Sequence, residues 1–323
     1  MKQRSKLLIL ATIPPPIGGV TIHIQRLLQY LNNNGYGYTF TDFRRSTKGD
    51  ILKQIRQHRF IHFHIYHPVV RCCFVLLGTI FGKRMLFTLH GNLGRHNALY
   101  NLLDQLAFRI AYMPIVLNQK SFEKGRKWNK RTQMIGAFIP PQQPEELNAS
   151  IQAAVAGMRA KYAGIYATNA STVSIDKAGN ETYQVTLLVN IFRKMKDDAL
   201  VISDASGRYK SFLQQQGLEI PANVLLISEP HPFFEILKRS DVFLRITTTD
   251  GDSLSVKEAL FLGKQVLATD VVNRPAGTQL VALNEWDIAD AIGKMRHDNT
   301  VYNRHTLSNG GEELLQLYKK VVA

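Results

Sequence analysis

Short, almost continuous apolar runs alternate with longer segments of mixed polarity through the first half of the chain. Such runs predict buried strands of a parallel sheet, and the segments between them have the spacing of helices that cover its two faces. We expect strands at Lys6–Thr12, Tyr38–Phe43, Phe60–Tyr66, Arg84–His90, Pro114–Asn118 and Gln133–Phe138. We expect helices at Val20–Asn32, Val69–Phe81 and Asn97–Ala111.

The second half of the chain repeats the alternation. Strands are expected at Gly164–Thr168, Ala199–Asp204, Val224–Ser228, Asp241–Ile246 and Gln265–Thr269. Helices are expected at Glu181–Lys196, Tyr209–Gln216, Phe233–Arg239, Leu254–Leu262 and Glu285–Asp298, with a final amphipathic helix at Gly311–Val322. Prolines and polar residues between Pro140 and Glu146 form the best linker in the sequence.

These patterns predict an α/β protein with two Rossmann-like domains facing each other across a cleft. We expect the first domain at residues 1–143 and the second at 144–304, with a helix in 305–323 that returns to the first domain. Ligands of open α/β sheets collect at the carboxyl ends of the strands, so the site is expected there.

Charge differs between the two halves of the chain. Residues 1–140 hold 21 Lys and Arg against 4 Asp and Glu, whereas residues 141–323 hold 19 against 21. This asymmetry indicates a polyanionic partner for the first half, either an anionic membrane surface or nucleic acid. The longest apolar run, Cys72 to Phe81, is too short to cross a bilayer, and the adjacent Cys72 and Cys73 indicate a reducing compartment.

Seven residues separate two carboxylates, Asp250 and Glu258, in the order strand, glycine loop, helix. Gly251 lets the backbone approach a ligand closely, and the start of the following helix offers N–H groups to an anion. Two carboxylates beside an anion site suit a ligand that has both hydroxyls and phosphates, such as a nucleotide-sugar. Acidic residues near helix starts are also common for purely structural reasons.

Two segments of the first half are further candidates. Gly18 and Gly19 occupy a strand-to-helix turn that can present backbone N–H groups to a phosphate or a sugar. His90 closes a buried strand directly before Gly91. His62, His64 and His67 lie on or after a neighbouring strand, but without a nearby carboxylate they make a weak metal site, and we favour structural roles.

The segment from Asp250 to Val272 resembles the E-x7-E signature of the retaining GT-B glycosyltransferases of family 4, with Asp250 in place of the first Glu and Gln265 in place of a Pro. Weaker support comes from Pro14–Val20, which resembles the family's glycine loop, and from Leu86–Asn92, which resembles its T-x-H-G segment. The basic pair that clamps the donor diphosphate in this family is incomplete. Lys177 matches its Lys, but the Arg has no match, and Lys257 and Arg274 are the candidates to replace it.

The resemblance implies a role for each matched position. Glu258 would accept hydrogen bonds from ribose hydroxyls, and Asp250 would hold hydroxyls of the donor sugar. His90 would face the transferred sugar. The remaining donor-binding positions would be Gly18, Gly19, Lys177, Asp252, Ser253 and Leu254. The family's reaction retains anomeric configuration and needs neither metal nor cofactor, because cations and helix N-termini neutralise the leaving diphosphate.

The sequence thus predicts an enzyme that moves a sugar from a nucleotide-sugar to a lipid-linked saccharide in bacterial surface polysaccharide synthesis. The apolar helix at 97–112 and the cations from Lys120 to Arg131 around Trp128 predict docking on the inner face of the plasma membrane. Two alternatives are open: a nucleotide-sugar epimerase of the same fold, and a basic nucleic-acid-binding protein. No zinc pattern, RRM signature or helix-turn-helix supports the second of these.

Overall fold

A computed structural model describes residues 6–296 and 307–322, which fall into two units. Unit 1 comprises Met1–Gln142 with Ser308–Ala323, and unit 2 comprises Gln143–Leu307. The chain therefore leaves unit 1 within the proline-containing linker, builds the whole of unit 2 and then returns to unit 1.

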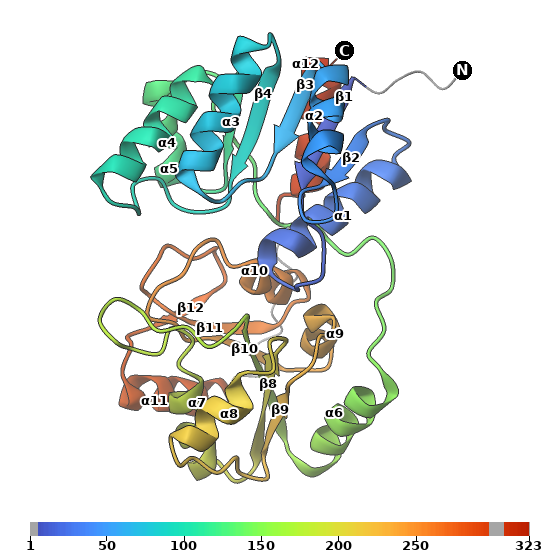
Figure 1. Cartoon of the computed structure of the whole chain (residues 1–323). Helices are drawn as coiled ribbons and strands as arrows, with labels where there is room; N and C mark the ends of the chain where they lie inside the picture. Colours follow the sequence, from blue (N-terminus) through green and yellow to red (C-terminus); the bar gives the residue numbers. More distant parts are fainter. Residues whose placement is uncertain (1–5, 297–306, 323) are drawn as a thin grey trace. The chain divides into compact units, whose positions relative to one another are not determined.

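Unit 1 is a parallel sheet of six strands in the order β2-β1-β3-β4-β5-β6, of which Figure 1 labels β1 to β4. Its strands are β1 (Leu7–Ala11), β2 (Thr39–Asp42), β3 (Phe60–Phe63), β4 (Arg84–Leu89), β5 (Met113–Val116) and β6 (Gln133–Met134). Its helices are α1 (Gly19–Asn33), α2 (Lys48–Gln57), α3 (Pro68–Ile80), α4 (Ala98–Ile110), α5 (Gln119–Trp128) and α12 (Gly310–Val322).

The apolar character of β1 on both sides explains why helices cover both faces of this sheet, because successive side chains of a strand point to opposite faces. Leu7 and Ile9 pack with residues of α1 and α12, whereas Leu8 and Leu10 pack with residues of α3 and α4. All five residues of β1 are fully buried.

Unit 2 repeats this plan with a parallel sheet in the order β12-β11-β10-β7-β8-β9. Its strands are β7 (Gly164–Ala170), β8 (Asp198–Asp204), β9 (Val224–Ile227), β10 (Val242–Arg245), β11 (Gln265–Thr269) and β12 (Gln279–Val281). Its helices are α6 (Ala149–Lys161), α7 (Val185–Lys194), α8 (Tyr209–Gln215), α9 (Phe233–Lys238), α10 (Leu254–Phe261) and α11 (Glu285–Arg296). Along β7, Tyr166 packs toward α7 and α11, while Ile165 and Ala167 pack toward α6, α9 and α10.

Three helices and one strand have no counterpart among the expected elements, and several expected elements are shorter than predicted. The unexpected elements are α2, α5, α6 and β12. Helix α2 has no fully buried residue: Ile51 and Ile55 pack against the core of unit 1 from one face of the helix, but both stay partly exposed. Helix α7 begins at Val185 rather than Glu181, because the Glu181 carboxylate accepts hydrogen bonds from the N–H groups of Val185 and Thr186 and so caps the helix from outside it. The last expected strand of the first half is confined to Gln133–Met134, and Asp298 lies outside the described residues.

None of the helices within residues 6–296 and 307–322 combines the length and the apolarity needed to cross a membrane.

Candidate functional site

Two polar clusters stand out, one in each unit, and both lie at the carboxyl edge of a parallel sheet. In unit 2 the cluster is centred on Asp250, in the loop between β10 and α10. Arg245, the last residue of β10, binds this carboxylate with two parallel hydrogen bonds, from Nε and Nη2, each 2.9 Å long. Nη1 of Arg274, in the segment after β11, donates to the same carboxylate at 2.6 Å.

All the acceptor positions of Asp250 are in use. Its Oδ1 also accepts the N–H of Gly251 at 2.9 Å, which makes four hydrogen bonds for a carboxylate that has about four lone-pair positions. Burial raises the pKa of Asp250, but Arg245 and Arg274 more than offset this effect and hold its pKa at about 2. A sugar hydroxyl would have to replace one of these donors to reach Asp250.

The cluster retains a positive charge that Asp250 alone does not neutralise. Two guanidinium groups share one carboxylate, and the exposed fractions of the three side chains are 10% for Arg245, 2% for Arg274 and 8% for Asp250. Cζ of Arg245 also lies 5.1 Å from the ring centre of Tyr183, and its Nη1 donates to the backbone oxygen of Asn169. An anion placed beside these guanidinium groups would balance the remaining charge.

Helix α10 begins directly after this loop. Ser253 is its N-cap, and its Oγ accepts the N–H of Val256. Asp252 forms an ion pair with Lys257 at 2.5 Å, so the side chain of Lys257 is already engaged. Leu254 is the first helical residue, and Glu258, one turn later, is 4% exposed. The first turn of the helix thus opens onto the loop that holds Asp250, with its positive dipole end toward that loop.

Lys177 lies in a tight turn between β7 and α7. The Asp176 carboxylate accepts the N–H groups of Ala178 and Asn180 and closes this turn, and Lys177 is exposed at its tip. The base of the turn is anchored near the cluster, because the N–H of Thr248 donates to the backbone oxygen of Thr182 at 3.0 Å.

Sequence reasoning gave Arg245 no role and named Arg274 only as one of two candidates to replace the missing arginine. The structure buries both side chains and pairs them with Asp250. One signal was present for Arg245, since an arginine that closes an apolar strand needs a buried partner. No local pattern marks Arg274, which reaches Asp250 from another loop.

The cluster of unit 1 includes the glycine turn before α1. Gly18 is the N-cap of α1 and donates its N–H to Oγ1 of Thr21, while Gly19 opens the helix. Thr21 Oγ1 in turn donates to the backbone oxygen of Pro16. A Cβ atom on Gly19 would meet nothing within 4 Å, so space is open at this position for a ligand.

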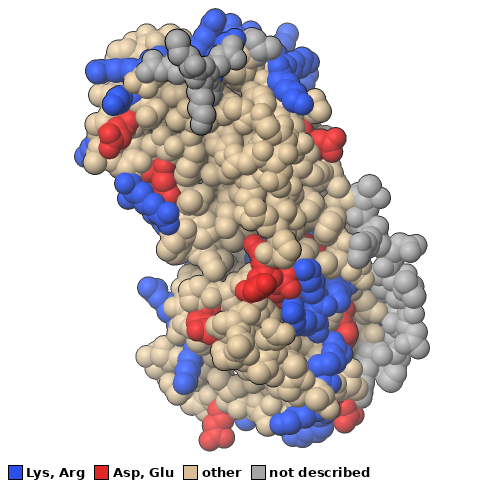
Figure 2. Space-filling model, turned by 90° about the vertical axis from the view of Figure 1, so that its right-hand side faces the viewer, with Lys and Arg blue, Asp and Glu red and all other residues tan. Residues whose placement is uncertain are grey.

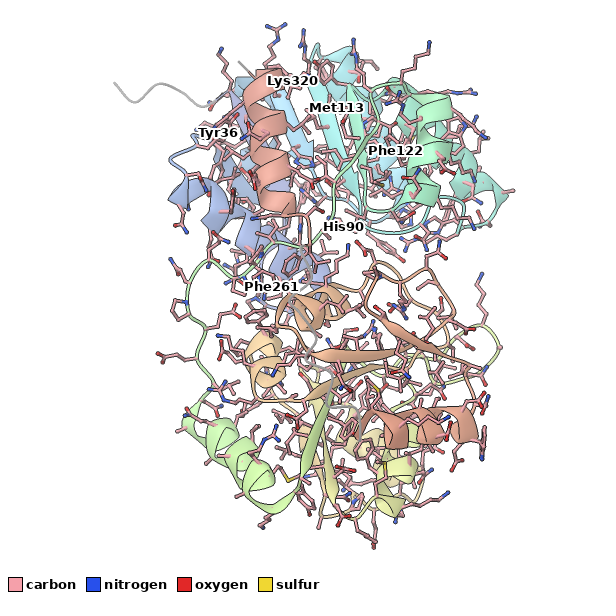
Figure 3. All side chains as sticks on the ribbon, turned by 180° about the vertical axis from the view of Figure 1, so that it is seen from behind. Tyr36, His90, Met113, Phe122, Phe261 and Lys320 are labelled. Atoms are coloured by element: carbon pink, nitrogen blue, oxygen red, sulfur yellow. The ribbon has the colours of Figure 1, made fainter. Side chains whose placement is uncertain are left out.

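His90 directly follows β4 and so lies at the carboxyl end of that strand. Figure 3 labels this residue. Its Nε2 lies 2.8 Å from Nδ1 of His64, the residue after β3. Burial and the neighbouring His23 hold the pKa of His90 well below its usual range, so the ring is neutral at physiological pH.

His62 has a structural environment. Its Nδ1 contacts the Tyr318 hydroxyl of α12 at 2.5 Å, and its Nε2 contacts Oγ1 of Thr88 at 2.9 Å. Burial lowers the pKa of His62 to about 3, with a smaller contribution from His23. His67 is exposed at the N-cap of α3 and packs against Tyr100.

Comparison with solved structures gives close matches of fold at low sequence identity, whereas no family model and no curated protein matches the chain. The complex of Anabaena HepE with UDP-glucose has a TM-score of 0.68 and 13% identity, with 96% of this chain and 94% of that chain covered. The UDP-GlcNAc 2-epimerase of Methanocaldococcus jannaschii has a TM-score of 0.66 and 13% identity, with 97% and 99% covered. WaaG, a glycosyltransferase involved in lipopolysaccharide biosynthesis, has a TM-score of 0.60 and 12% identity, with 98% and 95% covered.

The two parallel six-stranded sheets and these matches together define the fold class: the chain has the GT-B fold, as the sequence predicts. The same fold is present in a glycosyltransferase and in an epimerase. The fold alone therefore does not show whether a protein transfers or epimerises a sugar.

Proposed function

We propose that this protein is a retaining glycosyltransferase, related to family 4, that transfers a sugar from a nucleotide-sugar to a lipid-linked saccharide during bacterial surface polysaccharide synthesis. The observation that supports this most is the cluster of Arg245, Arg274 and Asp250 beside the start of α10. It places excess positive charge, helix N–H groups and carboxylates at one sheet edge, which are the groups that a sugar diphosphate needs.

In this proposal, Arg274 and Arg245 replace the arginine that the family resemblance lacks. Both guanidinium groups are already fixed by Asp250, so little side-chain freedom is lost when a diphosphate binds. Asp250 positions the two arginines, and Glu258 accepts the ribose hydroxyls. Lys177 adds a positive charge from the exposed turn, and His90 of unit 1 donates a hydrogen bond to a sugar hydroxyl.

The donor assignment is tested by thermal unfolding with UDP-, GDP-, dTDP- and CMP-linked sugars. A donor at 100 times its Kd stabilises the protein by about 2.7 kcal/mol, which is a clear rise in Tm. The variant Arg274→Gln keeps Asp250 paired with Arg245 and is expected to weaken donor binding by at least about tenfold. Lys161→Gln, at the exposed end of α6 on the amino side of β7, is the matched control. The proposal fails if none of these nucleotide-sugars raises Tm.

The acceptor side of the proposal depends on an apolar surface of unit 1. Helices α3 and α4 pack against each other, and their outward side chains include large apolar residues that are 41–68% exposed. These residues, which we call the apolar surface, are Val70, Leu76, Leu77 and Ile80 of α3 and Leu99, Leu102 and Leu106 of α4. Exposed apolar side chains of this size and number mark an interaction surface.

A basic pocket of about 480 Å³ lies at the ends of the same two helices. Its lining combines cations with aromatic rings, namely Lys83, Arg84, Arg109, Lys130 and Arg131 with Tyr112 and Trp128. Figure 2 shows Lys and Arg side chains at the end of unit 1 that is uppermost in that view. Apolar side chains beside cations suit an anionic membrane, into which the former insert while the latter bind the headgroups. We therefore propose that unit 1 docks on the cytoplasmic face of the plasma membrane, where lipid-linked acceptors lie.

Epimerisation is the second candidate, because an epimerase shares the fold at the same level of similarity. The two activities differ in their products. An epimerase releases an isomerised nucleotide-sugar without any acceptor, whereas a transferase releases the nucleoside diphosphate and requires an acceptor for full turnover. Analysis of the nucleotide products with and without a membrane extract separates the two.

A further inference from the structure

Three histidines from three separate segments converge at the carboxyl edge of the unit 1 sheet. His23 comes from α1, His64 directly follows β3 and His90 directly follows β4. One ring nitrogen of each lies within 4.8 Å of the corresponding nitrogens of the other two. The ring centres form a nearly equilateral triangle, with sides of 5.8 Å (His23–His64), 5.2 Å (His23–His90) and 5.1 Å (His64–His90).

We propose that His23, His64 and His90 bind one divalent transition-metal ion, with zinc the best match. Imidazole nitrogens bind zinc at about 2.0–2.1 Å, which places them about 3.4 Å apart in a tetrahedral site. The nitrogens here need to move by about 1.5 Å or less to reach that arrangement, a range within side-chain adjustment. The ion would replace the present hydrogen bond between His64 and His90.

The orientation of His23 favours a metal ligand. Its Nδ1 lies 2.8 Å from the backbone oxygen of Ala137, which can only accept a hydrogen bond. Nδ1 of the neutral ring therefore has the proton, and Nε2 has the lone pair. A carbonyl oxygen that binds the second ring nitrogen is the usual support of a metal-bound histidine, since it fixes both the tautomer and the plane of the ring.

The surroundings distinguish these three rings from the other histidines nearby. His62 lies only 4.4 Å from His64 between ring centres, but Tyr318 and Thr88 occupy both of its nitrogens. His62 therefore lines the site but is not a metal ligand. His23 and His64 are buried and His90 is partly exposed, so an ion can enter from the side of His90.

The ligand set indicates the class of metal. Three neutral imidazoles suit Zn²⁺, Co²⁺, Ni²⁺ or Cu²⁺, whereas Mg²⁺ and Ca²⁺ require oxygen ligands. Three protein ligands leave the fourth tetrahedral position to water, an arrangement typical of zinc sites that bind an exchangeable ligand. This site is made entirely by unit 1 and shares only His90 with the proposed donor site, whereas the diphosphate-binding cluster lies in unit 2.

The test uses tag-free, EDTA-treated full-length protein titrated with Zn²⁺, Co²⁺ and Mg²⁺ by calorimetry. We expect one Zn²⁺ per chain, no binding of Mg²⁺, and visible absorption from tetrahedral Co²⁺ that Zn²⁺ abolishes. X-ray absorption of the zinc form should show nitrogen neighbours at about 2.0–2.1 Å. Absence of stoichiometric Zn²⁺ binding to the wild-type protein would overturn the proposal without any variant being needed.

Single variants assign the ligands. His23→Gln, His64→Gln and His90→Gln should each weaken Zn²⁺ binding on the order of 100-fold. His67→Gln, three residues from His64 but exposed, is the matched control and should bind as the wild type does. Circular dichroism and thermal unfolding check that each variant is folded. If the folded variants bind Zn²⁺ as tightly as the wild type, the site lies elsewhere and the assignment is wrong. The nucleotide-sugar experiment has a separate readout, so either proposal can fail alone.

Discussion

Arg274 lies 24 positions after Asp250 in the sequence, yet its Nη1 is 2.6 Å from Oδ2 of that carboxylate. This contact joins the segment after β11 to the loop after β10, and it holds a guanidinium group at the carboxyl edge of the sheet. The pair is nearly withdrawn from solvent, so changes to either residue should have measurable effects on both stability and binding.

Removing the charge of Asp250 should destabilise unit 2. Asp250→Asn leaves Arg245 and Arg274 buried without a counter-charge, and breaking a buried ion pair in this way costs about 3 kcal/mol or more of unfolding free energy. Chemical denaturation measures the loss. Asp270→Asn, at an exposed position after β11, serves as the control and should change little.

The same pair predicts a specific pH dependence. The pKa of Asp250 is about 2 in the folded protein and 3.8 without its partners, so the folded state favours the ionised form. Its stabilising contribution is therefore complete above the unfolded pKa and is lost as the pH falls through about 2. The stability difference between wild type and Asp250→Asn should be constant above about pH 5 and should shrink between about pH 4 and pH 2. A difference that stays constant down to pH 2 would contradict the role of this ion pair.

Glu258→Gln should abolish sugar transfer while the fold is retained. The substitution preserves the size of a side chain that is 4% exposed, but it removes the charge and one acceptor needed for ribose hydroxyls. Transfer is measured with the donor identified by thermal shift, together with the unfolding temperature. An unchanged rate would remove Glu258 from the site.

Changes to the apolar surface and to the basic pocket should affect membrane docking in different ways, one in the strength of vesicle binding and the other in its dependence on lipid charge and salt. The double variant Leu77→Gln/Leu102→Gln replaces two residues that are 54% and 60% exposed, and it should reduce binding to vesicles at every salt concentration. Lys130→Gln/Arg131→Gln should instead remove the preference for anionic lipid and the salt dependence of binding.

A matched control exists on another helix of the same unit. Leu52 of α2 is 44% exposed, and Leu52→Gln should leave vesicle binding unchanged. Equal binding of the wild-type protein to neutral and anionic vesicles at low salt would exclude the proposed docking.

The fold could be predicted from the sequence because its strands are buried on both faces. Runs such as Leu7–Ala11 are apolar at every position, and this pattern belongs to parallel sheets covered by helices. Helix α2, by contrast, has no fully buried residue, and its apolar face is short, since only Ile51 and Ile55 pack against the core. The two-residue β6 is likewise too short to leave a pattern of its own.

Less of the candidate site could be predicted from the sequence, because its contacts join segments that are far apart in the chain. The setting of Asp250 and Glu258 in the sequence predicted the loop and the helix correctly as local structure; that Ser253 caps the helix is seen only in the structure. Nothing local shows that Arg274 returns to Asp250, or that His23 of α1 meets the histidines that follow β3 and β4. Such contacts depend on the order of strands in the sheet, which the sequence predicts only in general terms.

The return of α12 to unit 1 has a consequence for synthesis of the chain. Leu314 and Tyr318 of α12 complete the core that Leu27 and Leu31 of α1 begin, and these partners are separated by the whole of unit 2. While a ribosome makes the protein, one apolar face of the first unit stays uncovered until the final helix emerges, although unit 2 can fold before then. We therefore expect the nascent first unit to expose this apolar face until α12 is made, and a product that ends before Ser308 to keep it exposed.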